Sequence, residues 1–260
     1  ANPICKIEGD YNLNQAGNYN LTYRAIDSSQ NEQEIPFTLR VYEKKVTGSK
    51  GTSLKVTTDF EEVVATYKND DTLVGIDVSK WQGEIDFEKV KASGASFVMI
   101  RVGSQRGVGG EYVLDPYFKE NMEKALAAGL EVGTYFYSYA DGKKEAIKQA
   151  EWVLKMISPY DLTLPVVFDW ECYSFLNEME ISLFGLNEIA NAFLETIEKN
   201  NYSVMLYGSK NYLEAIWKYH EYPVWLAHYT KETDYKEEYV MWQLCQNGRI
   251  PGIEGDVDID

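Results

Sequence analysis

From Leu73 onward the sequence alternates short apolar runs with amphipathic segments, and this rhythm limits the possible folds more than any other feature. The run LVGIDV precedes FEKVKASG, SFVMIRV precedes PYFKENMEKALAAG, EVGTYFYSY precedes EAIKQAEWVLKMI, and LPVVFDW precedes LNEIANAFLETIEKN. Continuous apolar runs are typical of strands buried on both faces, as in parallel sheets covered by helices. The alternation therefore predicts an α/β fold with a parallel sheet.

The last part of the chain keeps the strands but shortens the helices between them. The runs SVMLYG, PVWLAHY, YVMWQL and a closing VDI complete the series. About eight candidate strands then share roughly 190 residues, whereas a (β/α) barrel typically takes about 250. We predict a flattened (β/α) barrel with irregular last strands over residues 71–260.

The first part of the chain has a different pattern. Apolar and polar residues alternate from Tyr19 to Ala25 and again from Phe37 to Val41, with the turn-forming run SSQNEQ between them. Such alternation is typical of strands with one buried face, and two such strands are too few for a sandwich core. The segment GNYNLTYRAIDSSQNEQEIPFTLRV resembles the second half of bacterial immunoglobulin-like surface modules. We therefore interpret residues 1–45 as a partial all-β module and 46–70 as a linker, with at least one helical turn expected around Phe60–Tyr67. A β-hairpin extension of the main domain is the alternative.

The charge of the chain restricts its partners. The formal net charge is −16, from 25 basic and 41 acidic residues. A field of this sign opposes binding to nucleic acid and to anionic lipid. No stretch approaches the roughly 18 apolar residues of a membrane span. The opening ANPICKIEGD lacks a basic region followed by an apolar run, so no signal peptide is visible in it.

Cysteine and histidine supply little material for chemistry. Cys5, Cys172 and Cys245 are too few and too scattered for a disulfide framework or a zinc motif. His220 and His228 are the only histidines, and their spacing suggests no metal site. We therefore expect no metal and no cofactor, and we favour carboxylate chemistry over a Ser/His/Asp or Cys/His nucleophile.

Acidic residues stand where the predicted strands end. In a (β/α) barrel the catalytic groups come from the C-terminal ends of the strands. Asp77 ends the first candidate strand, Asp169 and Glu171 end the fourth, and the last one carries three further acids, Asp256, Asp258 and Asp260. Residues i and i+2 of a strand point to the same face, so Asp169 and Glu171 should project together while Trp170 faces the other way.

Two neighbouring carboxyl groups match the needs of glycosidic cleavage. One must hold a proton for the leaving oxygen, and the other must stay ionised to attack or stabilise the sugar ring. Like charges held close raise the pKa of at least one of them, which supplies the acid. A D-x-E pair alone is more often two solvated loop acids. Its place after the apolar run VVF, together with the other strand-end aspartates, favours a catalytic site.

A family resemblance points the same way. The segment GIDVSKWQGEIDFEKVKASGASFVMIRVG resembles the opening of glycoside hydrolase family 25, the lysozymes of the Chalaropsis type. The segments VVFDWE, MLYGS, PVWLAHY, MWQ and GIEGDVDI match the family's succession of strand ends in order. The resemblance runs from Leu73 to the C-terminus. It implies a flattened barrel that cleaves the β-1,4 bond between N-acetylmuramic acid and N-acetylglucosamine in peptidoglycan, with retention of configuration.

The resemblance also implies roles for the acids. Glu171 matches the family's general acid, and Asp169 matches its partner, which acts as a nucleophile or steadies a substrate-assisted intermediate. The sequence leaves both mechanisms open. Asp77 matches the first-strand acid that sets the charge and hydrogen bonding of the site, and Asp258 matches the last-strand aspartate. Asp256 receives no role.

Further matching positions imply a sugar-binding groove. Its lining residues would be Tyr135, Tyr137, Tyr207, Trp225, Tyr229 and Gln243. Arg101 is expected to orient one of the acids through a charge-assisted hydrogen bond. His228 stands where relatives often have another polar residue, so contacts with the sugar can differ there. Cys172 is expected to be a small buried filler.

The resemblance makes the partner a peptidoglycan glycan strand and the location extracellular or wall-associated, and we expect a monomer. One alternative is a wall-binding module that holds glycan without cutting it, although all the acids are in place. A chitinase-like barrel is disfavoured, because its D-x-x-D-x-D-x-E run would require acids at Leu164 and Val167.

Overall fold

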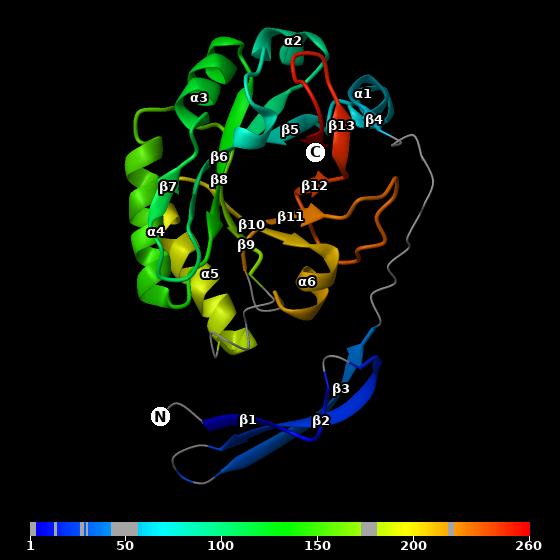
Figure 1. Cartoon of the computed structure of the whole chain (residues 1–260), viewed down its shortest axis with the longest axis vertical. Helices are drawn as coiled ribbons and strands as arrows, with labels where there is room; N and C mark the ends of the chain where they lie inside the picture. The colour runs from blue at the N-terminus through cyan, green and yellow to red at the C-terminus, as the bar shows by residue number, and fades with distance from the viewer. Residues whose placement is uncertain are drawn as a thin grey trace. The chain divides into compact units, whose positions relative to one another are not determined.

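The structure is a computed structural model that describes residues 4–12, 15–26, 29, 31–42, 57–172, 181–217 and 221–260. The chain divides into two compact units, Ala1–Lys55 and Val56–Asp260 (Figure 1). The described residues contain no helix that is both long and apolar enough to cross a membrane.

The smaller unit is a three-stranded antiparallel sheet. Its strands β1 (Ile4–Glu8), β2 (Gly17–Ile26) and β3 (Glu32–Val41) lie in the order β1-β2-β3. The two alternating segments of the sequence fall within β2 and β3. Leu21 is the buried apolar residue of this sheet, while Ile35 is 55% exposed. The sheet therefore has an apolar face with little cover within the described part of its unit.

The larger unit starts earlier than the sequence predicts. Within the segment expected to be a linker, β4 (Thr58–Asp59) pairs with β13 (Cys245–Arg249), and α1 (Phe60–Tyr67) follows directly. Asp59 caps this helix by accepting a hydrogen bond from the backbone N–H of Glu61 at 2.9 Å. Phe60 and Val63, one helical turn apart, are buried in the main core. Burial of these side chains fixes a polar-looking segment to the larger unit.

The larger unit is built on one curled, eleven-stranded sheet (Figure 1). Its parallel strands follow one another in space as β5 (Gly75–Val78), β6 (Phe97–Gln105), β8 (Glu131–Ser138), β9 (Val166–Trp170), β10 (Val204–Ser209), β11 (Val224–Ala227) and β12 (Met241–Gln243). The antiparallel strand β14 (Val257–Ile259) lies between β5 and β13, and β7 (Tyr112–Leu114) pairs with β6. Strand β12 lies at one end of the strand order, and β13 lies near the other end, beyond β5 and β14. Only Leu244 separates β12 from β13 in the sequence, so the chain directly connects the two ends of the sheet.

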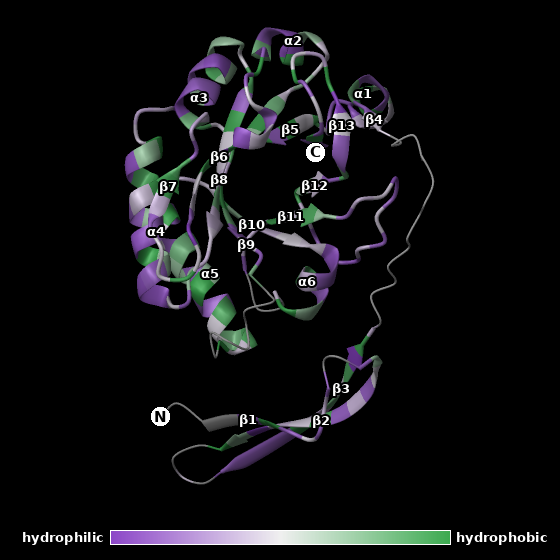
Figure 2. Ribbon diagram, in the orientation of Figure 1, coloured by the Kyte–Doolittle hydropathy of each residue, from purple (hydrophilic) through white to green (hydrophobic). Residues whose placement is uncertain are grey.

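Helices cover the outside of this sheet. They are α2 (Phe87–Ala92), α3 (Phe118–Ala127), α4 (Lys143–Ile157), α5 (Leu183–Glu198) and α6 (Lys210–Ala215), while the short helix η1 (Lys80–Gln82) follows the end of β5. Helix α4 buries Ala146, Ala150, Val153 and Ile157, which share one helical face. Figure 2 shows the corresponding mixture of hydrophilic and hydrophobic stretches along α3 and α4. The predicted mixed α/β fold with parallel strands and outer helices is confirmed.

The sheet has two faces with different contents. On β9, Phe168 and Trp170 belong to the main core between sheet and helices, whereas Val167 belongs to a smaller cluster on the inner face. The indole Nε1 of Trp170 donates to the carbonyl oxygen of Ala140 at 3.0 Å, on the outer side. The expectation that Trp170 faces away from Asp169 is therefore confirmed, and the alternate residues of β9 point inward.

Candidate active site

The predicted acids meet on the inner face of the sheet. Asp77 on β5 lies directly opposite Asp258 on β14, and Asp169 on β9 lies beside Tyr137 on β8. Asp77 and Asp169 are each only 5% exposed. The charge of Asp169 acts on Asp77, and the charge of Glu171 acts on Asp258. The fold thus brings four acids from distant parts of the sequence into one electrostatic cluster.

Asp169 and Glu171 form a tightly coupled pair. Burial raises the pKa of Asp169, and the charge of Glu171 raises it further. Burial also raises the pKa of Glu171, and a hydrogen bond joins the two carboxyl groups. Because two adjacent carboxylates resist joint ionisation, the pair retains a proton at a pH where free carboxyl groups have lost theirs. The positive charge of Arg101 opposes the rise at Asp169 and so favours its ionised form.

One oxygen of Asp169 is left open. Among the described residues, none hydrogen-bonds to its buried Oδ1. A buried carboxylate oxygen without a partner is costly and is expected to be matched by a ligand, a water molecule or a reacting group. The free oxygen of Asp169 therefore suits direct contact with a substrate.

Gln243 connects Asp77 to two tyrosines. Its Nε2 donates to Asp77 Oδ2 at 2.6 Å, and its Oε1 accepts from the hydroxyls of Tyr207 at 2.9 Å and Tyr229 at 3.1 Å. These partners fix which end of the amide faces Asp77. Burial, followed by the charges of the β14 aspartates, raises the pKa of Asp77, and the bond from Gln243 works against that rise. Gln243 acts here as a buried connector between strands.

The aspartates in and beside β14 differ from one another. Burial raises the pKa of Asp258 to about 6, with further contributions from Asp256 and Glu171. Asp256 pairs with Arg249 and stays at the edge of the cluster. Asp260 is buried, and its Oδ1 accepts from the indole Nε1 of Trp225 at 2.8 Å. No role is predicted for Asp260 from the sequence; its charge acts on Asp77, so it belongs to the acidic cluster.

Trp225 does not lie where a sugar could reach it. It is 1% exposed and packs edge-on against Tyr207 at 5.0 Å and Tyr135 at 5.9 Å between ring centroids. The expectation that Trp225 lines a groove is therefore wrong, because a fully buried indole cannot stack on a ligand. Trp225 instead supports the two tyrosines from beneath. The sequence places an aromatic residue at a strand end, but it does not tell whether that residue lines a groove or is buried behind it.

The predicted tyrosines differ in exposure. Tyr207 is 9% exposed and places its hydroxyl on Gln243, whereas Tyr229 is 49% exposed and reaches the same amide from the solvent side. Tyr135 and Tyr137 are partly exposed, and burial together with the charge of Glu171 raises the pKa of Tyr137. Tyr135, Tyr137 and Tyr229 are thus the aromatic residues that present surface near the acids.

Arg101 makes its hydrogen bonds to a residue that the sequence reasoning missed. Its Nε and Nη2 donate to Asp115 Oδ2 at 2.9 and 2.6 Å, and it acts on Asp169 through its charge. The expected direct bond to a catalytic acid is replaced by this ion pair. Asp115 also accepts from the backbone N–H groups of Lys80 and Tyr117, each at 3.0 Å. An acid inside the apolar run VLDPYF was the available signal.

The described cysteines and histidine fit no other chemistry. Cys172 is buried, and burial raises the pKa of its thiol to about 12, so it remains a poor nucleophile. His228 Nδ1 lies 2.9 Å from Thr233 Oγ1, and His220 lies outside the described residues. Within the described ranges, no group of three or more His, Cys, Asp or Glu residues could hold a metal ion.

Comparisons with known proteins give the family. The protein YegX from Escherichia coli (strain K12), an uncharacterized protein, is 28% identical over 194 residues, covering 73% of this chain and 69% of that protein. The autolytic lysozyme of Clostridium acetobutylicum is 27% identical over 191 residues, covering 72% of this chain and 54% of its own. The modular autolysin LytC from Streptococcus pneumoniae, solved with a synthetic peptidoglycan ligand, gives a TM-score of 0.64 at 19% identity, over 92% of this chain and 56% of that chain.

The chain thus spans about half the length of that lysozyme and that autolysin. Residues 76–253 match the profile described as Glycosyl hydrolases family 25. This range holds the acid pair, Asp77, Arg101 and Gln243, and it covers more than half of the chain. The chain therefore belongs to glycosyl hydrolase family 25.

Proposed function

We propose that this glycoside hydrolase is a lysozyme that cleaves the β-1,4 bond between N-acetylmuramic acid and N-acetylglucosamine in peptidoglycan. The observation that carries the proposal is the pair of Asp169 and Glu171 at the end of β9, where Asp169 is buried and no described residue hydrogen-bonds to its Oδ1. Two proteins that this chain resembles, an autolytic lysozyme and an autolysin solved with a peptidoglycan ligand, support this substrate. The action would then be at the cell wall, outside the cell, with the enzyme working as a monomer.

The position of Glu171 supports its role as general acid. It directly follows β9, and burial raises the pKa of its carboxyl group, so it holds a proton to a higher pH than a free glutamate does. The pair can place its proton on either residue. The interaction within the pair raises the pKa of Asp169 and lowers that of Glu171, whereas the charge of Arg101 favours the arrangement in which Asp169 is ionised and Glu171 is protonated. Glu171 would then give this proton to the leaving glycosidic oxygen.

Asp169 would act on the other side of the reaction. Its unpartnered Oδ1 can attack the anomeric carbon, or it can steady the ring formed when the substrate's own N-acetyl oxygen attacks. In both routes the leaving sugar departs with the proton of Glu171. Water then attacks the anomeric carbon, and Glu171 takes up a proton from that water. Two displacements at one carbon retain its configuration.

The surrounding residues would position the acids and the glycan. Gln243 holds Asp77 in place, and Asp258, when ionised, adds negative charge that stabilises a positively charged sugar ring in the transition state. Tyr135, Tyr137 and Tyr229 present aromatic surface beside the acids, which suits the apolar faces of sugar rings. The buried residues Tyr207 and Trp225 would act by positioning alone.

The N-terminal unit has a separate proposed role. We propose that it is part of an immunoglobulin-like module that spaces or positions the hydrolase. The antiparallel order β1-β2-β3 and its apolar face support this assignment. Deletion of residues 1–55 should leave the rate on soluble glycan strands unchanged while altering binding to intact walls. A loss of rate on soluble strands would contradict the separation of roles.

The test of the main proposal is digestion of purified peptidoglycan, followed by borohydride reduction and mass spectrometry of the new ends. We expect new muramitol ends, with a loss of at least about a hundredfold in rate for Glu171→Gln. Glu151→Gln, on the exposed side of α4, is the matched control and should retain the wild-type rate. Glucosaminitol ends would mean that the other glycosidic bond is cut. A protein that sediments with walls but releases nothing would be a binding module instead.

A further inference from the structure

The segment after Asp77 carries an unusually exposed indole. Trp81 is 76% exposed, more than any other large apolar side chain in the described part of the larger unit. It belongs to the short helix η1, four residues beyond Asp77. Single exposed apolar residues are common on proteins, so exposure alone assigns no function. The surroundings of Trp81 supply the further observations.

The backbone beneath Trp81 is held on both sides. Ser79 and Gln82 form a reciprocal cap, in which the Ser79 Oγ accepts from the Trp81 N–H and the Gln82 Oε1 accepts from the Ser79 N–H at 2.9 Å. The Gln82 Nε2 donates to a backbone carbonyl just before β14, at 3.2 Å. The N–H of Lys80 donates to the buried Asp115 at 3.0 Å. An exposed ring on a backbone fixed in this way loses little entropy when a ligand binds.

The same contacts tie Trp81 to the acid pair. Asp115 Oδ2 accepts from both the Lys80 backbone and the Arg101 side chain, and the charge of Arg101 acts on Asp169. Four residues of extended chain span at most about 14 Å, so Trp81 stays within that distance of Asp77. The indole therefore lies at the same edge of the sheet as the acids, within reach of a polymer bound across them.

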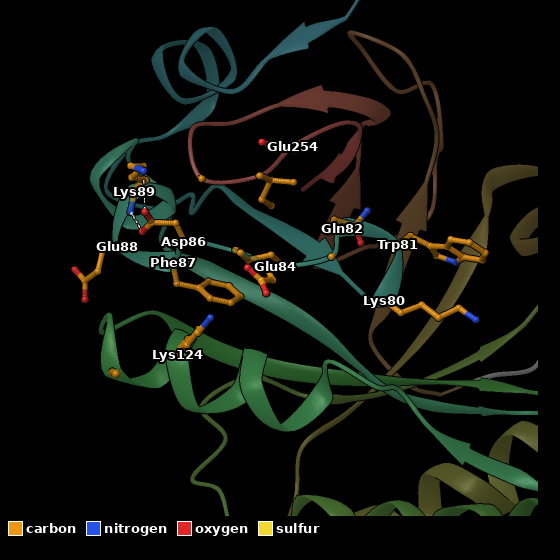
Figure 3. Close-up of a pocket in the computed structure, with 15 residues that line it drawn as sticks. Lys80, Trp81, Gln82, Glu84, Asp86, Phe87, Glu88, Lys89, Lys124 and Glu254 are labelled. Atoms are coloured by element: carbon orange, nitrogen blue, oxygen red, sulfur yellow. Dashed lines mark hydrogen bonds and ion pairs between the residues drawn. The ribbon is translucent and has the colours of Figure 1, made fainter.

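Lys80 gives the exposed ring a charged neighbour. Its Nζ lies 4.8 Å from the centroid of the Trp81 ring. Figure 3 shows both side chains extending the same way, away from Asp86 and Lys89. In a chain of net charge −16, an anionic group on a ligand requires a local cation of this kind. An indole beside an ammonium group suits a sugar ring that carries a carboxylate nearby.

A cavity continues from this pair. It has a volume of about 1000 Å³, and Lys80 and Trp81 are among the residues that line it. Its other lining side chains include charges of both signs, Asp86, Glu88, Lys89, Lys124 and Glu254 (Figure 3). The Trp81 and Lys80 side chains extend away from Asp86 and Lys89 in this lining, so a ligand held by the two side chains lies outside the cavity.

We propose that Trp81 and Lys80 form a subsite for a muramyl residue that flanks the cleaved bond and still carries its acidic peptide stem. The indole stacks on the sugar ring, and the Lys80 ammonium pairs with a carboxylate of the stem. This inference rests on the proposed lysozyme function and adds a preference for stem-bearing strands.

The test measures binding by the full chain carrying Glu171→Gln, so that strands are held without fast cleavage. Two probes are titrated: soluble peptidoglycan strands with their stems, and the same strands after an amidase has removed the stems. Adding Trp81→Ala should weaken binding of both probes about tenfold. Adding Lys80→Met, which keeps the aliphatic stem of the side chain, should weaken binding of the stem-bearing probe alone, by about threefold.

Two further variants complete the design. Trp81→Tyr keeps a flat ring and should retain most of the affinity for both probes. Leu73→Ala removes another exposed apolar residue, at the opposite end of β5, and should leave both Kd values unchanged. Unchanged Kd values with Trp81→Ala would overturn the subsite, and equal weakening of both probes by Lys80→Met would overturn the contact with the stem.

Failure of this inference is distinguishable from failure of the proposed function. If the wild type forms muramitol ends but Trp81→Ala binds both probes normally, the subsite is wrong and the lysozyme stands. If the wild type forms no new ends but Trp81→Ala loses affinity, the lysozyme is wrong and the glycan subsite is supported.

Discussion

The two faces of the sheet use neighbouring residues of β9 for opposite purposes. On the outer face, Phe168 and Trp170 are buried among helices, and the Trp170 N–H has a carbonyl partner. On the inner face, Asp169 is buried with one oxygen unpartnered and with its pKa raised. Satisfied apolar packing stabilises the fold, whereas a buried, unsatisfied carboxyl group works against it. The difference indicates that the outer face holds the structure together and the inner face is kept for chemistry.

The largest expected effect comes from the inner face. Asp169→Asn should lower the rate of peptidoglycan cleavage about a thousandfold, because an amide neither attacks the anomeric carbon nor stabilises positive charge. Its melting temperature should be unchanged or higher, since a buried carboxyl group is replaced by a neutral amide. Parallel rate and thermal-denaturation measurements check both parts. Asp161→Asn, at an exposed position, is the control. A variant that loses stability together with activity would contradict the division between the faces.

The neighbouring residue should behave in the reverse manner. Phe168→Ala leaves a cavity in the outer core, so the free energy of unfolding should fall by about 3–5 kcal/mol. The rate per folded molecule should stay within a fewfold of wild type below the melting transition. Chemical denaturation and initial rates at the same temperature measure the two quantities. A hundredfold loss of rate in protein shown to be folded would mean that the outer face also controls the chemistry.

The sequence predicted which acids of the inner face stand at strand ends, but not which neighbouring side chains are buried or which residues they contact. Strand periodicity placed Asp77, Asp169 and Glu171 at strand ends, and the structure brings them together on one face. The same rule could not tell that Trp225 is 1% exposed, because burial within the curled sheet depends on neighbouring strands. Asp115 was missed for a related reason: its contacts with Arg101 and the Lys80 backbone join segments far apart in the sequence.

The start of the larger unit was predicted only in part. The helical turn expected around Phe60–Tyr67 is present as α1, but its attachment to the larger unit was not predicted. Strand β4 has two residues, too few for a clear periodic signal. Only the pairing of β4 with β13, nearly two hundred residues later in the chain, shows that this segment belongs to the sheet. By contrast, the strands β6, β8 and β9 are long apolar runs, and the sequence alone indicated them.

Two buried glutamines, one on each face of the sheet, are expected to differ in the same way, with smaller effects. On the inner face, Gln243→Leu removes the donor to Asp77 and should lower the rate by roughly tenfold to a hundredfold, since that bond holds Asp77 in place. On the outer side, Gln149 accepts from Ser138 at 2.6 Å and donates to Gln105 at 2.7 Å. Gln149→Leu should instead reduce stability by about 1–3 kcal/mol, with little change in rate. If Gln149→Leu lowers the rate and Gln243→Leu lowers only the stability, the hydrogen bonds of Gln149, rather than those of Gln243, position the reacting groups.

The smallest expected effect is in the pH dependence of stability. Burial raises the pKa of Asp258 from its ordinary value to about 6 in the folded protein. The folded state then binds this proton more tightly than the unfolded state, so the contribution of Asp258 to stability is complete below about pH 4. This contribution to stability declines as the pH rises toward 6, because the Asp258 carboxyl group loses its proton less readily in the folded protein than in the unfolded chain.

Asp258→Asn removes this titration while keeping a side chain of similar size. We expect the decline in melting temperature between about pH 4 and 6 to be shallower in the variant than in the wild type. Asp161→Asn should leave the slope unchanged, because that residue is exposed. Equal slopes in Asp258→Asn and wild type would mean that Asp258 titrates as it does in the unfolded chain. Burial on the inner face would then make ionisation costly for Asp77 and Asp169 but not for Asp258. The acidic cluster would exclude Asp258, although β14 places it directly opposite Asp77.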